Sequence, residues 1–329
     1  MARCRPARGR CAEGRGAPVS VSPNAGKPVL LVTAADLAPQ ALGLLQDFEV
    51  IYAGKTPTED DIVALCGRYN PVAIIVRYGS VGAKAIDAAP ALRVISKHGS
   101  GTDTIDKVAA KARNVQVCAA VGANAAAVAE QALALLLACA KSVPKLNTRM
   151  HAGLWDKATH KSLELGGRTI GLIGLGAIGL RFARMVQAMD MRVIGFDPYA
   201  RQFPPGVEQV DLETLWRTSD AISFHCPLTG ENRNMLNEST LALCKPGVIV
   251  VNTARGGLID EVALLAALRS GRVASAGLDS FAVEPMTAGH PFQGEERIVL
   301  SPHIGGVTSD AYVKMGVASA ENVLAALRG

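Results

Sequence analysis

Three ionisable residues in the second half of the chain have one feature in common. Arg255, Glu284 and His303 each come a few residues after an apolar run that is typical of a buried β-strand. Ligands of open parallel sheets bind beyond the carboxyl ends of the strands, so we expect these side chains to meet there. Taken singly, each could be an ordinary surface or loop residue. Their shared location favours a catalytic set.

The three side-chain types suit hydride transfer between a nicotinamide and a 2-keto or 2-hydroxy acid. The guanidinium of Arg255 is permanently charged and forked, so it could bind a carboxylate and polarise the neighbouring carbonyl. His303 titrates near neutral pH and could exchange a proton with the carbonyl oxygen. A carboxylate beside it, Glu284, would favour the protonated imidazole and raise its pKa. The nicotinamide would supply the hydride.

A glycine-rich turn predicts the dinucleotide site. Gly174, Gly176 and Gly179 follow the apolar run 169–173 and open a helical pattern. In that order, they allow a tight turn, the approach of a pyrophosphate, and close packing of helix on strand. Asp197 lies 18 residues past Gly179, where a carboxylate can accept hydrogen bonds from the adenosine ribose. It would also repel a 2′-phosphate, so NAD is favoured over NADP, although a nearby arginine keeps NADP open.

Alternating apolar runs and helical patterns predict the elements that position these residues, an α/β protein with two doubly wound parallel-sheet domains. In the first half, strands are expected at 28–33, 49–52, 72–77, 93–97 and 115–119, separated by helices at 37–46, 58–69, 81–89 and 103–112. A long helix, 124–141, should then lead into a six-stranded sheet with strands at 169–173, 192–196, 220–225, 248–252, 274–279 and 298–301. A final helix, 308–328, should return to the first domain.

Composition indicates a well-cored protein with room for two domains, since 49% of the 329 residues are apolar and 19% are charged. Much of the net charge of +5 lies in an arginine-rich tail, residues 1–26, which we expect to be disordered, with an interaction arm as the alternative.

The charge and hydropathy patterns of the rest of the chain predict no nucleic-acid binding and no membrane span. The seven cysteines lack metal-type pairing, so we expect reduced thiols, no metal site and a cytoplasmic protein.

Five motifs resemble those of the D-2-hydroxyacid dehydrogenase family, over nearly everything from Lys27 to Gly329. They are GLIGLGAIG at 171–179, HCPLT at 225–229, VNTARGGLID at 251–260, LDSFAVEP at 278–285 and SPHIGG at 301–306. The resemblance implies a Rossmann domain, 123–306, inserted into a flavodoxin-like substrate domain, 27–122 plus 307–329, with the active site in the cleft between them. It also implies a homodimer formed through the nucleotide-binding domain, to which helix 124–141 and the Trp155 segment could contribute.

The same resemblance implies roles for individual residues. Arg255 would bind substrate, Glu284 would assist, and His303 would be the acid/base. Asp279 would contact the nicotinamide carboxamide. The full set of expected cofactor contacts is Gly174, Gly176, Ala177, Ile178, Gly179, Asp197, His225, Cys226, Pro227, Thr229, Thr253, Ala254, Asp279 and Gly305. The expected substrate-binding residues are Tyr78, Gly79, Ser100 and Gly101, the glycine loop at 99–101 having an ordinary strand-to-helix turn as its alternative.

These observations favour an NAD-dependent 2-hydroxyacid dehydrogenase acting on hydroxypyruvate, glyoxylate or a 3-phosphoglycerate-like acid. Two alternatives stay open: an NAD-responsive binding module with the same fold, and an enzyme similar to formate dehydrogenase. Formate oxidation needs no proton donor to a carbonyl, so a histidine supported by a glutamate suits keto-acid reduction better. Some relatives that act on phosphoglycerate carry regulatory domains after the catalytic part, and none is expected after Gly329.

Overall fold

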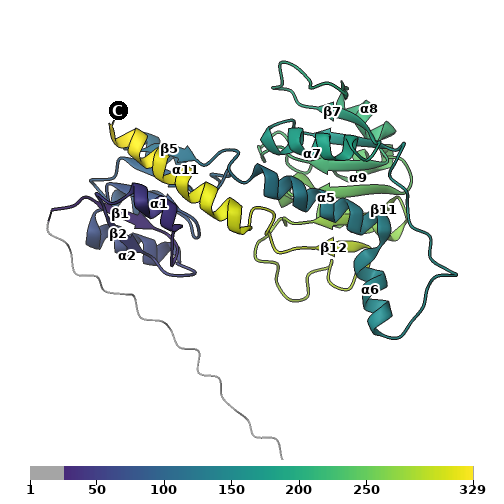
Figure 1. The fold of residues 1–329 in the computed structure, drawn as a ribbon, viewed down its shortest axis with the longest axis horizontal. Coiled ribbons are helices and arrows are strands. Elements are labelled where there is room, and N and C mark those ends of the chain that lie inside the picture. The colour runs from purple at the N-terminus through teal and green to yellow at the C-terminus, as the bar shows by residue number, and fades with distance from the viewer. Residues whose placement is uncertain (1–25, 329) are drawn as a thin grey trace, which may run out of the picture. The chain divides into compact units, whose positions relative to one another are not determined.

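Two parallel β-sheets form the framework of the chain in a computed structural model that describes residues 26–328 (Figure 1). The described residues divide into two compact units. The first contains residues up to His98, Thr102–Cys118 and the stretch from Ser319, and the second contains Gly99–Gly101 and Ala119–Ala318. The predicted fold class is confirmed. The boundaries predicted for the two functional domains differ slightly from these units and stay a prediction. Apart from Gly26, the predicted disordered tail lies outside the described residues.

The first sheet has the strand order β2-β1-β3-β4-β5 in the described part of the chain. Its strands are β1 (Val29–Val32), β2 (Glu49–Tyr52), β3 (Ala73–Val76), β4 (Val94–Lys97) and β5 (Gln116–Ala119). This is the order of flavodoxin-like folds, in which ligands bind at the carboxyl ends of the strands. The five strands lie where the sequence predicts them.

Among the described residues, three of the four helices of this sheet are shorter than predicted. They are α1 (Pro39–Leu44), α2 (Glu59–Tyr69), α3 (Ala83–Asp87) and α4 (Lys107–Ala112). Helix α2 matches its prediction because Thr58 and Asp61 form a capping box. Helix α4 begins later than predicted, because the carboxylate of Asp106 accepts hydrogen bonds from the N–H groups of Val108 and Ala109 and so caps the helix.

The second sheet has the order β12-β11-β10-β9-β6-β7-β8 among the described residues. Its strands are β6 (Thr169–Ile173), β7 (Arg192–Phe196), β8 (Val207–Gln209), β9 (Ala221–Phe224), β10 (Val248–Asn252), β11 (Val273–Leu278) and β12 (Ile298–Leu300). The direction of winding reverses between β6 and β9, as in a Rossmann fold. The prediction of six strands was wrong, because β8 was missed: this edge strand has three residues, of which Glu208 and Gln209 are exposed.

Helices on both faces of the second sheet bury two large apolar clusters. They are α5 (Ala125–Lys141), α6 (Val143–His151), α7 (Ala177–Gln187), α8 (Leu212–Thr218), α9 (Glu238–Leu243) and α10 (Glu261–Arg269), with the short 3₁₀ helix η1 (Gly256–Leu258). Helix α5 packs against α7 and lies mostly in the core. Among the described residues, no single helix is long and apolar enough to cross a membrane, and α5 and α6 together reach that length only across a 62° bend.

The last helix, α11 (Ser309–Arg328), begins in the second unit and ends in the first. Within the first unit, the Ser319 hydroxyl donates a hydrogen bond to the carbonyl oxygen of Lys97 at 3.2 Å. The side-chain amide of Asn322 donates to the Ser96 hydroxyl at 3.5 Å. Both contacts reach β4, so the end of α11 is anchored on the first sheet.

Candidate active site

The glycine turn after β6 has the geometry that the sequence predicts. Gly174 has a φ of +94°, and a Cβ there would lie 2.8 Å from the backbone nitrogen of Cys226. A Cβ on Gly179 would overlap the carbonyl oxygen of Gly174. A Cβ on Gly176 would meet no described atom within 4 Å, so the space next to its Cα is open. The first and third glycines therefore serve packing, and the second leaves room for a ligand.

The N-terminus of α7, which contains Ala177 and Ile178, follows this turn directly. Its N-cap residue, Gly176, has no side chain to occupy the first N–H groups of the helix. Such groups bind phosphate through hydrogen bonds and the helix dipole. Asp197 lies close by at the end of β7, where one carboxylate oxygen accepts a hydrogen bond from the Leu175 N–H at 2.8 Å. The other oxygen accepts from the Tyr199 N–H at 2.9 Å. Lone pairs remain on both oxygens for ribose hydroxyls.

The loop after β9 carries the predicted cofactor residues His225 to Thr229. The His225 ring packs against Phe182, and desolvation lowers its pKa to about 3, so its imidazole is neutral. Burial raises the pKa of the Cys226 thiol to about 11, which leaves it protonated. The Asn232 side chain accepts from the Thr229 N–H at 2.7 Å and donates to the Pro227 carbonyl at 2.8 Å. Sequence reasoning missed Asn232, whose only signal was its place in a polar turn.

Two buried polar atoms at the ends of β9 and β10 have no hydrogen-bond partner among the described residues. They are Nδ1 of His225 and Oγ1 of Thr253. A buried polar group without a partner costs about 1–3 kcal/mol, so such groups commonly point to a missing ligand or water. Together with the glycine turn and Asp197, they fit a dinucleotide at the carboxyl end of the second sheet.

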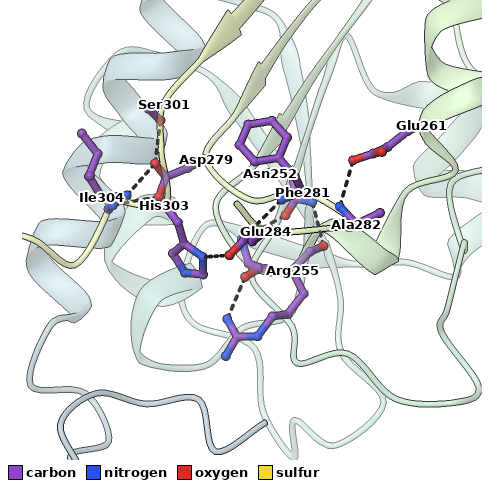
Figure 2. Close-up of polar contacts among 12 residues, drawn as sticks. Asn252, Arg255, Glu261, Asp279, Phe281, Ala282, Glu284, Ser301, His303 and Ile304 are labelled. Atoms are coloured by element: carbon purple, nitrogen blue, oxygen red, sulfur yellow. Dashed lines mark hydrogen bonds and ion pairs between the residues drawn. The ribbon is translucent and has the colours of Figure 1, made fainter. Parts of the chain in front are cut away.

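Glu284 and His303 form the central pair of the site (Figure 2). Oε2 of Glu284 lies 2.7 Å from Nδ1 of His303, and Oε1 accepts a hydrogen bond from the Phe281 N–H at 2.9 Å. The hydrogen bond to Glu284 raises the pKa of His303 and outweighs the opposing effect of burial. Burial acts to raise the pKa of Glu284, but its hydrogen bonds to His303 and Phe281, with nearby positive charge, hold it below its ordinary value.

Asp279 fixes the loop that carries His303. One carboxylate oxygen accepts from the Ser301 hydroxyl at 2.6 Å and from the Ile304 N–H at 3.0 Å. The other accepts from the Gly305 N–H at 2.7 Å. These bonds support the left-handed backbone conformation of His303, which has a φ of +53°. Asp279 is buried, and its hydrogen bonds in this structure orient the His303 loop. The predicted contact of Asp279 with the nicotinamide carboxamide stays a prediction.

Arg255 is presented by a turn that Asn252 holds. The side chain of Asn252, buried at the end of β10, accepts from the Ala254 N–H and donates to the Arg255 carbonyl, both at 2.9 Å. The positive charge of Arg255 adds to the lowering of the Glu284 pKa and opposes part of the rise in the His303 pKa, so the three predicted residues come together (Figure 2). Sequence reasoning missed Asn252. Its signal was a polar residue at the end of an apolar strand.

The predicted substrate residues lie in two places. In the first unit, the Thr33 hydroxyl donates to the Tyr78 carbonyl at 2.6 Å, and the Tyr78 ring is exposed. Gly79 has a φ of +71°, and a Cβ there would lie 2.8 Å from the Pro57 carbonyl oxygen. In the second unit, the Ser100 hydroxyl donates to Oδ1 of Asn124 at 3.1 Å. The left-handed glycine in this second loop is Gly99, with a φ of +148°, rather than Gly101.

Comparison with known families gives a match over the nucleotide-binding region. Residues 133–305 match the family described as D-isomer specific 2-hydroxyacid dehydrogenase, NAD binding domain. The matched stretch contains the glycine turn, Asp197 and the Arg255, Glu284 and His303 loops. The prediction of NAD as the cofactor is confirmed at this level.

Individual relatives extend the match into the first unit. The chain is 38% identical over 306 residues to a D-3-phosphoglycerate dehydrogenase of Mycobacterium bovis, covering 92% of this chain and 57% of that protein. It is 41% identical over 253 residues to a hydroxypyruvate reductase of Thermotoga maritima, covering 76% of this chain and 83% of that protein. The chain thus spans little more than half the length of the curated phosphoglycerate dehydrogenase. Among solved structures, the TT0316 protein of Thermus thermophilus has a TM-score of 0.83 and 35% identity, over 92% of this chain and 97% of that chain.

Proposed function

Because the chain belongs to the D-isomer specific 2-hydroxyacid dehydrogenase family, we propose that it interconverts a small 2-hydroxy acid and the corresponding 2-keto acid with NAD(H). The observation that carries this proposal is the 2.7 Å contact between His303 and Glu284, with Arg255 close to both. The pair supplies an acid/base, and the arginine supplies a cation for a carboxylate. Both are needed for keto-acid chemistry.

In this proposal, each of the three residues Arg255, His303 and Glu284 has a separate role. NADH, when bound, supplies the hydride that the carbonyl carbon receives. The Arg255 guanidinium binds the substrate carboxylate and polarises the carbonyl. Since Nδ1 of His303 is engaged by Glu284, the proton passes from Nε2 to the carbonyl oxygen. Glu284 stabilises the imidazolium that donates it. In the oxidative direction, the same nitrogen accepts the hydroxyl proton.

The cofactor would be held along the carboxyl end of the second sheet. Gly174, Gly176, Gly179 and the start of α7 would bind the pyrophosphate, and Asp197 the adenosine ribose. The unpartnered Thr253 hydroxyl supports the placing of polar cofactor groups near β10. The remaining proposed contacts are Ala177, Ile178, His225, Cys226, Pro227, Thr229, Ala254, Asp279 and Gly305.

For the substrate, we propose hydroxypyruvate, glyoxylate or a 3-phosphoglycerate-like acid. The names of two relatives, a hydroxypyruvate reductase and a D-3-phosphoglycerate dehydrogenase, support this range. In addition to Arg255, the proposed substrate-binding residues are Tyr78, Gly79, Ser100 and Gly101. A site for the carboxylate and carbonyl alone accepts all these acids, because they differ only in the third carbon and its substituent.

Steady-state assays test the function. We expect NADH oxidation with at least one 2-keto acid of a panel containing glyoxylate, hydroxypyruvate and the keto form of 3-phosphoglycerate, and weaker oxidation of NADPH. Formate with NAD is the contrasting arm. A protein that binds NADH but turns over no keto acid would be an NAD-responsive binding module instead. Formate-dependent NADH production would point to the third alternative.

We also propose that the protein is a homodimer. The segment from α6 to the following turn exposes several large apolar side chains, namely Val143, Met150, Leu154 and Trp155. Exposed apolar groups gathered on one segment commonly mark an interface. Helix α5 is mostly buried in its own core, so the α6 segment is the better candidate. Light scattering of the purified protein, with Trp155→Glu as the disrupting variant, checks the oligomeric state. A cytoplasmic location remains a prediction from the sequence.

A further inference from the structure

We propose that Glu261 and His290 are positioning residues, which hold the Phe281–Ala282 peptide and thereby set the carboxylate of Glu284 against His303. The inference rests on the proposed function, because it takes Glu284 and His303 as the acid/base pair. Neither residue touches the pair directly, so both would act through the backbone of the Glu284 loop.

Two carboxylates bind the two successive N–H groups of this peptide segment (Figure 2). The Phe281 N–H donates to Oε1 of Glu284, and the Ala282 N–H donates to Oε1 of Glu261, each at 2.9 Å. Glu284 lies on the same loop, whereas Glu261 is the first residue of α10. The start of α10 is itself fixed by its N-cap, Asp260, which accepts from two backbone N–H groups. Glu261 therefore ties the loop that carries Glu284 to the start of helix α10.

The second oxygen of Glu261 reaches the far end of the same loop. Oε2 lies 3.3 Å from Nε2 of His290, and both side chains are mostly buried, at 20% and 16% exposed. Nδ1 of His290 accepts from the Phe292 N–H at 3.3 Å, so Nε2 carries the proton and donates it to Glu261. The His290 ring packs between Phe281 and Phe292, with centroid distances of 6.4 and 4.9 Å. One carboxylate thus joins both ends of the segment that contains Glu284.

The held peptide also lies against the Arg255 turn. Gly256 follows Arg255 directly, and a Cβ on Gly256 would overlap the backbone of Phe281 and the nitrogen of Ala282. Only a residue without a side chain permits this approach. A shift of the peptide would therefore change the position of Glu284 relative to both Arg255 and His303. Displacements of about 1 Å at a catalytic group can cost about 100-fold in rate, so the contact has a measurable consequence.

The chain of contacts makes a specific prediction about Glu261→Ala. The variant loses the acceptor for the Ala282 N–H and the partner of His290, so the segment that carries Glu284 is held by fewer contacts and the carboxylate is positioned less precisely against the imidazole. We expect kcat for keto-acid reduction to fall at least about 10-fold, with the dissociation constant for NADH nearly unchanged. The alkaline limb of the kcat profile should move to lower pH, in the same direction as for Glu284→Gln. Glu261→Gln keeps an oxygen for Ala282 and should show a smaller effect.

Glu238→Ala is the matched control. Glu238 is also the first residue of a helix, α9, and is exposed, so the control removes the same charge at the same helical position without touching the Glu284 loop. In a Glu284→Gln background, Glu261→Ala should move the pH limb no further, because it acts through the carboxylate that is already gone. A further shift of similar size in that background, or a normal kcat and pH limb in Glu261→Ala, would overturn the proposal.

An NMR titration of the His303 imidazole separates this inference from the proposed function, because it needs no turnover. We expect Glu261→Ala to lower the pKa of His303 and Glu238→Ala to leave it unchanged. Should Glu261→Ala fail to fold, Glu261→Gln and His290→Gln carry the same measurement. An unchanged His303 titration in folded Glu261 and His290 variants would sink the positioning role, whatever the substrate panel shows. Absence of turnover with a shifted titration would instead count against the proposed reaction.

Discussion

Nδ1 of His303 lies 2.7 Å from Oε2 of Glu284, which leaves Nε2 as the imidazole nitrogen able to exchange a proton with a ligand. The two residues are 19 positions apart in the chain, and each is held by a different contact: Glu284 by the Phe281 N–H, and the His303 loop by Asp279. The pair is therefore assembled from two independently anchored loops. Its protonation follows from this contact, since the carboxylate raises the pKa of the imidazole.

Removing the imidazole should stop proton transfer and spare cofactor binding. We predict that His303→Ala lowers kcat by about 10²–10⁴-fold, the usual contribution of general acid catalysis. The dissociation constant for NADH, measured by fluorescence, should change little, because the contacts proposed for the pyrophosphate and the adenosine ribose, the glycine turn and Asp197, do not involve the imidazole. His151→Ala, at the exposed end of α6, is the control for replacing a histidine. Equal turnover in His303→Ala and the parent would refute the assigned role.

Neutralising Glu284 should move the pH profile. Reduction needs the imidazolium, and Glu284 raises the pKa of His303, so Glu284→Gln should shift the alkaline limb of reduction to lower pH. The oxidative direction needs the neutral imidazole, and its acidic limb should move the same way. Both limbs are read from kcat against pH, with Glu296→Gln, an exposed glutamate paired to Lys145, as the control. Profiles that coincide with the parent would mean that Glu284 does not act on the imidazole.

Cofactor preference should depend on Asp197. We predict that Asp197→Ala raises the KM for NADH about 10–100-fold, as expected for lost hydrogen bonds to a charged acceptor at about 1.5–3 kcal/mol. Binding of NADPH should weaken less or improve, because the carboxylate that repels a 2′-phosphate is absent. The ratio of kcat/KM values for the two cofactors measures the effect. An unaltered ratio would mean that Asp197 does not bind the adenosine ribose.

Two glycines of the turn should respond differently to alanine. A Cβ on Gly179 overlaps the Gly174 carbonyl oxygen, so Gly179→Ala should lower the free energy of unfolding by about 1–3 kcal/mol even without cofactor. Gly176→Ala meets no described atom within 4 Å and should leave that stability unchanged, yet weaken NADH binding by filling the approach to the pyrophosphate. Thermal melts with and without NADH distinguish the two. Equal stability losses in both variants would contradict this division.

The Glu284–His303 pair should stabilise the fold only within a pH window. The raised pKa of His303 contributes stability that is complete below the ordinary imidazole value of 6.5 and is lost as pH rises through the folded value. The lowered pKa of Glu284 contributes stability above the ordinary carboxyl value of 4.5, lost as pH falls through the folded value. The double-mutant coupling energy from denaturant unfolding should therefore be largest between these two values. Both side chains are partly exposed, so about 1 kcal/mol or less is expected.

Much of the fold could be predicted because its strands are continuous apolar runs. Strands β6 and β10 are buried along their whole length, and such runs are visible without any tertiary information. Edge strand β8 could not be predicted, because only one of its three residues is buried and it forms no apolar run. Helix α4 began late because the cap is Asp106, and Asp103 was an equally plausible start from sequence alone.

By itself, the sequence determined the dinucleotide turn and the three loops that carry Arg255, Glu284 and His303, because glycine spacing and strand ends are local properties. Only the tertiary structure decided which groups hold those residues: Asn252 for the Arg255 turn, Asp279 for the His303 loop, and Glu261 for the Glu284 loop. Hydrogen bonds of this kind join residues that are distant in the chain. They depend on how loops pack at the edge of a sheet. The position of a carboxylate in the sequence does not indicate which N–H group it will bind.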